Sequence, residues 1–127
     1  MVPPRTVSDP RRPPTAAVFH ILLALVGGEL HGYGIMQRVE RFTEGRVRLG
    51  PGTLYRSIQS MQADGLIEEA DERPDPALDD ERRRYYRLTD RGRDVAEAEA
   101  ERLAALVDVV RDAGLLPAHT SVPEGAS

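Results

Sequence analysis

The order of periodic patterns along the chain is the feature that most limits its fold. Three segments repeat apolar residues at the spacing of an α-helix. They cover residues 16–28, about 32–43 and 51–64. Two short strand-like runs follow at 66–70 and 83–88, and a long helical segment then ends near Gly114. Three helices followed by a two-stranded hairpin is the order of a winged helix-turn-helix. We therefore expect a mainly α-helical fold with a small β-hairpin and one additional C-terminal helix.

Residues suited to helix ends support these boundaries. Thr15 and Thr89 are suitable N-caps for the first and last helices. Gly45 suits the C-cap of the second helix. Gly65 suits the left-handed residue after the third helix, and Leu66 would then fold back onto that helix in a Schellman motif. The apolar residues of the first helix cover nearly its whole circumference, which predicts a helix buried on most sides.

Composition excludes several classes of protein. The 127 residues suffice for one domain with its own core. Without cysteine, the chain has no disulfide scaffold and no thiolate zinc site. The three histidines, His20, His31 and His119, lack the spacing of metal ligands. No nucleophile–base pair and no phosphate-binding glycine loop is evident, so we expect neither an enzyme nor a cofactor. No apolar run has the roughly 20 residues of a membrane helix, and the first residues do not form a secretory signal, so we expect a cytoplasmic protein.

Charge is distributed in sharp blocks along the second half of the chain. All 17 basic residues are arginine, and the net charge is −4. Residues 82–93 contain six arginines and one aspartate, whereas residues 68–81 contain eight acids and one arginine. Residues 94–112 are again acidic. The basic block marks a local site for an anionic partner more clearly than the mean charge does.

Three sequence stretches carry a resemblance to a known family. They are LLALVGGELHGYGIMQRVE at 22–40, GPGTLYRSIQSMQADGLIEE at 50–69 and RRRYYRLTDRG at 82–92. Together they resemble the PadR-like family of bacterial transcriptional regulators, in its subgroup with a short C-terminal helix. The resemblance implies a winged helix that binds double-stranded DNA and a C-terminal helix that forms a homodimer. It also implies a repressor that a small hydrophobic or phenolic effector releases.

The resemblance and the polar face of the third helix together assign a DNA-binding site. Tyr33 and Tyr55 would contact phosphates, while Thr53 and Arg56 would contact base edges or the backbone. Gln59 lies on the same polar face, and the arginines where the hairpin returns would contact the backbone. The expected DNA-binding residues are Tyr33, Thr53, Tyr55, Arg56, Gln59, Arg82, Arg83 and Arg84. The acidic tip of the hairpin argues against insertion of the wing into a groove.

Each of these residues also has a structural interpretation. The two tyrosines could be half-buried, the polar face could be only solvated, and the arginines could neutralise the acidic hairpin. We interpret His31 as a structural or capping residue and His20 as a packed or interface residue. On the second strand, Tyr86 and Leu88 should face inward and Tyr85 and Arg87 outward.

The last helix carries an apolar stripe that a monomer would expose. The expected dimer interface consists of Ala96, Ala100, Leu103, Leu106, Val107 and Val110. An effector pocket could form where this helix meets the first one. Its expected walls are Val18, Phe19, Leu22 and Ala104, continued by Ala100, Leu103 and Val107.

The chain then divides into four parts. They are a disordered arm at 1–14, a DNA-binding domain at 15–88, a dimerisation helix at 89–114 and a disordered tail at 115–127. Two-fold symmetry predicts a pseudo-palindromic operator. The alternative is a winged helix whose acidic wing binds a basic protein partner. That module would expose apolar anchors on the third helix, where this chain has polar residues.

Overall fold

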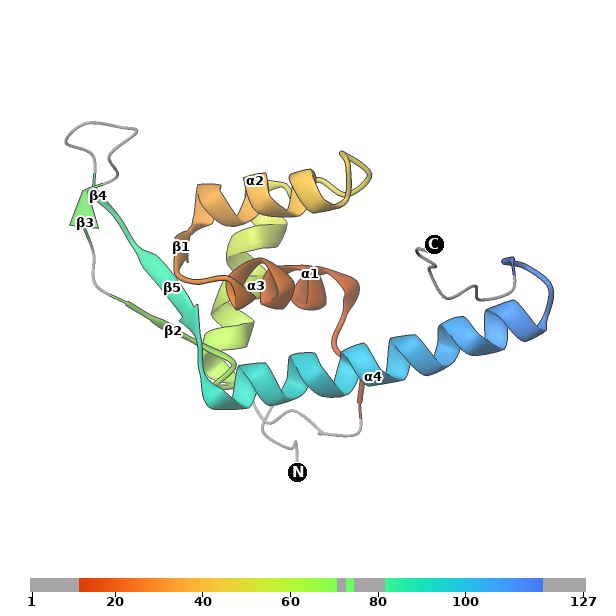
Figure 1. The fold of residues 1–127 in the computed structure, drawn as a ribbon. Helices are drawn as coiled ribbons and strands as arrows, with labels where there is room; N and C mark the ends of the chain where they lie inside the picture. The colour runs from red at the N-terminus through yellow and green to blue at the C-terminus, as the bar shows by residue number, and fades with distance from the viewer. Residues whose placement is uncertain (1–11, 71–72, 75–81, 118–127) are drawn as a thin grey trace, which may run out of the picture.

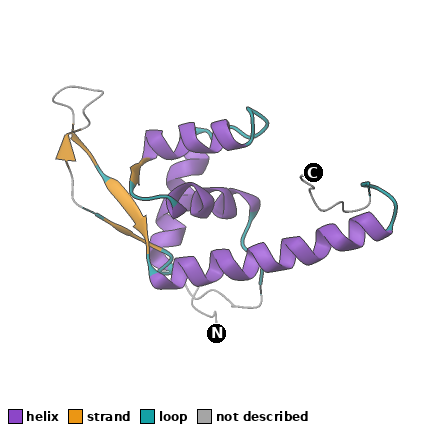
Figure 2. Cartoon of the chain, in the orientation of Figure 1, coloured by secondary structure: helices purple, strands orange, loops and turns teal. Residues whose placement is uncertain are grey.

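The computed structural model describes residues 12–70, 73–74 and 82–117, and it confirms the winged helix-turn-helix architecture (Figures 1 and 2). The elements are α1 (Ala16–Val26), β1 (Leu30–His31), α2 (Gly32–Phe42), α3 (Pro51–Ala63), β2 (Ile67–Glu69), β3 (Arg73–Pro74), β4 (Arg82–Arg83), β5 (Tyr85–Leu88) and α4 (Asp90–Asp112). None of the helices in these ranges combines the length and apolar character that a membrane span requires. Residues 1–11 of the expected arm and 118–127 of the expected tail lie outside the described residues.

A small antiparallel sheet combines a strand from between α1 and α2 with two strands from between α3 and α4. Its strand order is β1-β5-β2, and β3 pairs with β4 farther along the wing. The hairpin of β2 and β5 agrees with the prediction, and Ile67 lies opposite Leu88. The two-residue strand β1 was not predicted, because a run this short has no alternation that a sequence can show.

The unpredicted strand corrects the expected orientation of Tyr85. We expected this side chain to face outward, but it is buried. β1 places His31 opposite Tyr85, and the two rings meet edge to face with centroids 5.2 Å apart. The predictions for the other β5 residues hold, since Tyr86 is buried, Leu88 packs against the core and Arg87 is exposed. A third strand therefore covers a position that a two-stranded hairpin would leave open.

The core forms around α1, which contacts all three other helices. Its buried residues are Ile21, Leu22, Ala24 and Leu25, in agreement with the predicted apolar circumference. Leu23 and Val26 are exceptions and remain partly exposed. The other fully covered core side chains are Ile35, Val39, Leu54, Ile58 and Met61. α1 is thus the central helix on which the helix-turn-helix is assembled.

Most predicted helix ends are confirmed by their hydrogen bonds. Thr15 and Thr89 cap α1 and α4 through their hydroxyl groups. Leu66 donates its N–H to the carbonyl of Met61 at 2.9 Å, as the Schellman motif requires. The end of α2 differs from the prediction, because its C-cap is Thr43 rather than Gly45.

Thr43 ends α2 early because its hydroxyl closes a local turn. The hydroxyl donates to the carbonyl of Val39 at 2.8 Å and accepts the N–H of Val47 at 3.1 Å. Gly45 follows with a positive φ of 79°, and its N–H donates to the carbonyl of Glu40. This turn redirects the chain from α2 toward α3.

The last helix extends well beyond the domain. α4 has 23 residues, and its first turns pack against α1 and β5 (Figure 1). The C-terminal half then projects past the other helices, on the side away from the strands (Figure 2). At 1.5 Å per residue, the whole helix spans about 34 Å.

Candidate nucleic-acid interface

The third helix presents a polar face to solvent. Leu54, Ile58 and Met61 anchor α3 in the core, as the apolar stripe predicts. The predicted reading residues Thr53, Arg56 and Gln59 are all exposed. They follow one another at intervals of three residues, so they lie along one side of the helix. The fold therefore brings these three side chains onto a single accessible face.

Arg56 offers an exposed guanidinium on this face of α3. Its Nη1 lies beside the first turn of α3, where a Cβ added at Gly52 would be 3.4 Å away. Within the part of the chain that the structure describes, Arg56 forms no ion pair. The planar fork of donors is therefore accessible to a phosphate or to the acceptor edge of a guanine.

The two predicted phosphate-contacting tyrosines are both partly exposed, and Tyr55 reaches the start of α2. Tyr33 is 49% exposed and Tyr55 is 46% exposed. The Tyr55 hydroxyl lies directly against Gly32, where a Cβ would overlap with it. A residue other than glycine at this position would thus displace the ring. The fold thus places Tyr55 of α3 against Gly32, the residue that precedes Tyr33 in α2.

The N-terminus of α2 adds a partial positive charge at this point. His31 caps the helix, because its Nδ1 accepts the N–H of Gly34 at 3.0 Å. The capping interpretation of His31 is therefore confirmed. A helix N-terminus with exposed hydroxyl donors beside it is a favourable position for a phosphate group.

The predicted arginines of the wing are only partly described. Arg82 and Arg83 form β4, and their side chains lie outside what the structure describes. Arg84 is exposed and pairs with Glu69 at 3.5 Å. An exposed pair of this kind is weak, so the arginine can exchange its partner for a phosphate. The acidic tip at 71–72 and 75–81 also lies outside the described residues.

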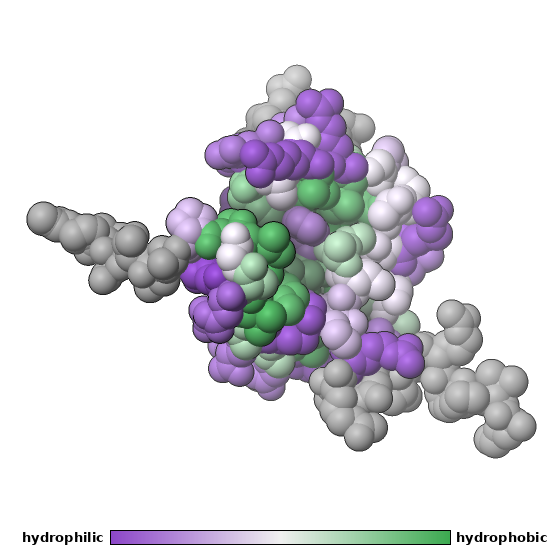
Figure 3. Space-filling model, turned by 90° about the vertical axis from the view of Figure 1, so that its right-hand side faces the viewer, coloured by the Kyte–Doolittle hydropathy of each residue, from purple (hydrophilic) through white to green (hydrophobic). Residues whose placement is uncertain are grey.

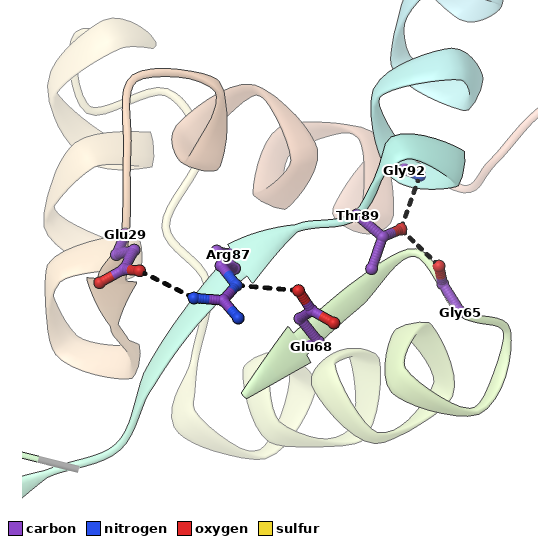
Figure 4. A network of polar contacts seen from close by, with 6 residues as sticks. All are labelled: Glu29, Gly65, Glu68, Arg87, Thr89 and Gly92. Carbon is purple, nitrogen blue, oxygen red and sulfur yellow. Dashed lines mark hydrogen bonds and ion pairs between the residues drawn. The ribbon is translucent and has the colours of Figure 1, made fainter. Parts of the chain in front are cut away.

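Arg87 braces the base of the wing. Its Nε donates to Glu68 of β2 at 2.8 Å, and its Nη1 lies 3.4 Å from Glu29, which precedes β1 (Figure 4). The hydrogen bond with Glu68 is the largest cause of the raised pKa of Arg87. Arg87 thus ties together the two strands that flank β5, and it is already occupied by carboxylates.

The predicted dimer stripe on α4 divides into two parts. Ala96 is only 7% exposed and belongs to the core of its own chain, so the expectation that a monomer would expose it is wrong. It lies on α4, which packs against both α1 and β5. Leu103 and Val110 are half-buried, and Ala100, Leu106 and Val107 are exposed.

Further apolar residues extend this exposed surface toward the end of the helix. They are Val109, Leu115 and Leu116, which the predicted stripe did not include. Leu115 and Leu116 follow the helix, so a helical repeat could not have identified them. Figure 3 looks onto this end of the molecule, and hydrophobic residues gather on that face.

The four expected pocket residues do not share one accessible surface. Leu22 is fully buried in the core, so a ligand could not touch it without displacing its neighbours. Val18 and Phe19 pack partly against the core, whereas Ala104 is exposed on α4. The pocket stays a prediction that would need a second surface to close it.

Comparison with known proteins decides the family. The profile of the "Transcriptional regulator PadR-like family" matches residues 21–98, which is more than half of the chain. This chain belongs to the PadR-like family. A PadR-like protein is a transcriptional regulator rather than an enzyme, so the family agrees with the expected absence of a catalytic site. The matched region runs from α1 into α4 and includes the whole polar face of α3.

Two curated relatives differ in how much of their length the PadR-like chain covers. Transcriptional regulator Rv3488 of Mycobacterium tuberculosis is 33% identical over 106 residues, which is 84% of this chain and 90% of that protein. An uncharacterized 37.1 kDa protein in transposon TN4556 of Streptomyces fradiae is 36% identical over 86 residues, or 68% of this chain. This chain spans only 22% of the Streptomyces protein.

Solved structures share the fold of this PadR-like chain. A PadR family transcription regulator from Clostridium difficile R20291 has a TM-score of 0.65 at 22% identity, with 77% of this chain and 97% of that one covered. Bacillus subtilis PadR in complex with operator DNA has a TM-score of 0.56 at 18% identity. That comparison covers 89% of this chain and 53% of the Bacillus chain.

Proposed function

We propose that this chain is a homodimeric repressor that binds specific double-stranded DNA through α3. The observation that carries the proposal is the exposed polar face of Thr53, Arg56 and Gln59, whose arginine has no carboxylate partner among the described residues. Membership of the PadR-like family and the fold shared with a PadR–operator complex support this function.

In the proposed complex, α3 enters the major groove and the surrounding residues hold the backbone. Arg56 contacts base edges, because its guanidinium fits the acceptors of guanine. Tyr33 and Tyr55 contact a phosphate at the N-terminus of α2. Arg82, Arg83 and Arg84 add backbone contacts from the wing, with Arg84 leaving Glu69 to do so.

The proposed dimer forms through the projecting half of α4. Leu106 and Val107 are the centre of the surface that a second copy would cover, because both are large, apolar and exposed. A two-fold dimer presents two copies of α3 to half-sites about one helical turn apart, so the operator is pseudo-palindromic.

We propose that DNA binding is regulated by a small hydrophobic or phenolic effector, which binds near the dimer interface and releases the DNA. Val18, Phe19 and Ala104 would contribute to this site from one chain, and the partner's α4 would supply the remaining wall. Because the proposed ligand is the DNA of the cell, we place the protein in the cytoplasm.

A fluorescence anisotropy titration tests the DNA-binding proposal. One labelled duplex carries the promoter of the chain's own gene, and its control has the same bases in scrambled order. We expect at least tenfold tighter binding to the promoter, with an affinity that falls steeply as salt rises. Equal and weak binding to both duplexes would contradict the proposal and favour the alternative, in which the acidic wing binds a basic protein.

A further inference from the structure

The start of α4 is bonded to three successive carbonyl groups at the end of α3. Arg91 Nε donates to the carbonyl of Asp64 at 2.9 Å. The Thr89 hydroxyl donates to the carbonyl of Gly65 at 2.5 Å, and the Thr89 N–H donates to the carbonyl of Leu66 at 3.1 Å. All three acceptors follow α3 directly, and all three donors lie in the cap and first turn of α4.

Thr89 joins the two helices through a single oxygen atom. Its Oγ1 also accepts the N–H of Gly92 at 3.0 Å, which caps α4 (Figure 4). The cap of one helix is therefore the same group that binds the end of the other. Thr15 caps α1 in the same way but forms no hydroxyl bond to α3, so the chain contains a matched cap without this link.

The backbones approach closely at this junction. Gly92 is buried, and a Cβ there would overlap with the carbonyl oxygen of Leu66. The first turn of α4 thus lies directly on the residue that ends the Schellman motif of α3. Since interiors are packed without free space, such a contact resists both sliding and tilting.

A small tilt at this junction would have a large effect on a dimer. α4 spans about 34 Å, so a tilt of about 10° at its start moves its far end by about 6 Å. Changing the separation of two half-sites by one base pair moves them by about 3.4 Å and rotates them by about 35°. The angle between α3 and α4 therefore determines which separation of half-sites a dimer can bind.

We propose that the α3–α4 junction sets the half-site spacing that the dimer accepts, with Thr89 as its positioning residue. This inference rests on the proposed function, because it needs DNA binding by α3 and dimerisation by α4. Thr89 does not contact DNA in the proposed complex. It fixes the orientation of α4, the proposed dimerisation helix, relative to α3, the proposed DNA-binding helix.

The test measures affinity as a function of spacing. The wild-type chain first selects an operator from random-sequence duplexes, and a series of duplexes then carries the two half-sites at separations from two base pairs fewer to two more. Thr89→Val removes the hydroxyl, Thr89→Ser keeps it, and Thr15→Val removes the matched cap of α1. Thr89→Asp keeps an N-cap acceptor but has no proton to donate to the carbonyl of Gly65.

We expect the wild type, Thr89→Ser and Thr15→Val to prefer one spacing sharply. In Thr89→Val and Thr89→Asp that preference should weaken by about two- to tenfold, the range that one neutral hydrogen bond supports. Binding to a single half-site and dimerisation, followed by light scattering, should stay as in the wild type. If Thr89→Val does not fold, Thr89→Asp gives the same comparison with its cap intact.

Two results would overturn the inference. If affinity depends on spacing in Thr89→Asp as it does in the wild type, Thr89 is only a helix cap. If the wild type binds all spacings equally, the α3–α4 junction does not set the spacing. Neither result affects the proposed function, since the chain would still bind its operator. If the wild type selects no duplex at all, the proposed function fails and the inference falls with it.

Discussion

Arg56 is the residue on which the proposed recognition of DNA depends most. Its exposed guanidinium lies on the same side of α3 as Thr53 and Gln59, and it has no ion pair among the described residues. A guanidinium with no internal partner does not stabilise the fold through a salt bridge. Its removal should therefore weaken binding and leave folding nearly unchanged.

Arg56→Ala should cost about 1–3 kcal/mol of operator affinity and relax sequence preference at one position of each half-site. Arg56→Lys should recover only part of the loss, because an ammonium lacks the planar fork. Arg111→Ala, in the last turn of α4 and outside the polar face of α3, is the control and should keep the sequence preference of the wild type. Anisotropy titrations measure all three, and an Arg56→Ala chain with normal affinity and normal preference would remove Arg56 from the site.

Gly92 and Gly34 form a matched pair for testing close packing. Each is the third residue of its helix, and each donates its N–H to the capping side chain. A Cβ at Gly92 would overlap with the Leu66 carbonyl oxygen, whereas a Cβ at Gly34 would meet only side-chain atoms, at 3.5 Å. The two positions are therefore equivalent along their helices, and they differ in the room that the structure leaves for a Cβ atom.

Gly92→Ala should lower the free energy of unfolding by about 1–3 kcal/mol, since a backbone atom must move to admit the methyl group. Gly34→Ala should be neutral or slightly stabilising, because alanine favours helix and the contact is an ordinary one. Urea unfolding followed by circular dichroism measures both. Equal effects of the two substitutions would show that the junction can accommodate the added atom.

At the scale of elements, α4 carries a carboxylate that packing has almost covered. Glu99 is only 6% exposed, and both of its oxygens accept hydrogen bonds from Arg102, at 2.8 and 2.6 Å. The bond from Arg102 is the largest influence on Glu99 and lowers the pKa of its carboxyl group. The arginine thus allows a charged residue to occupy the face of α4 that lies near the domain.

This lowered pKa predicts a particular dependence of stability on pH. The charged pair stabilises the folded chain above the unfolded pKa of glutamate, near 4.3, and that contribution is lost as pH falls through the lower folded pKa. Glu99→Gln should therefore be less stable than wild type at pH 7, with a difference that shrinks below about pH 4. Urea unfolding at both pH values measures it, with Glu101→Gln as an exposed control. A difference that does not change with pH would contradict this role of the pair.

The elements also show what the sequence alone could predict. Helix order, the Thr15 and Thr89 caps and the polar face of α3 follow from local patterns, and the fold contains them. β1 could not be predicted, because its two residues are defined only by pairing with β5. The second hydrogen bond of the Thr89 hydroxyl is unpredictable for the same reason, since its acceptor Gly65 lies 24 residues away in the chain. Contacts between distant segments depend on tertiary packing, which no local repeat records.

For the molecule as a whole, the exposed apolar end of α4 is the surface on which the proposed dimer depends. Leu106 is 47% exposed at the centre of this region, and Val109 and Leu115 are more exposed still. Burying one leucine is worth about 1.5–3 kcal/mol, and a two-fold dimer would bury each such residue twice. Ala96 takes no part in this surface, because its own chain already covers it.

Leu106→Asp should convert the proposed dimer to a monomer, since two carboxylates would face each other near its two-fold axis. Operator affinity should fall with it, because the two half-sites would no longer be bound by one linked molecule. Leu106→Ala should weaken the dimer less, as it removes contact area without adding charge. Multi-angle light scattering decides the matter, and a Leu106→Asp chain that stays dimeric would assign the interface to another surface.

Hydroxyl-radical footprinting on the selected operator tests recognition of DNA by a two-fold dimer, because it detects both copies of α3 at once. We expect two symmetric protected stretches whose centres lie about 10 base pairs apart, one for each half-site. Arg56→Ala should weaken both stretches equally, and Leu106→Asp should abolish them at concentrations where the wild type protects fully. A single protected stretch, or protection that does not change in Arg56→Ala, would contradict recognition of a two-fold operator by the polar face of α3.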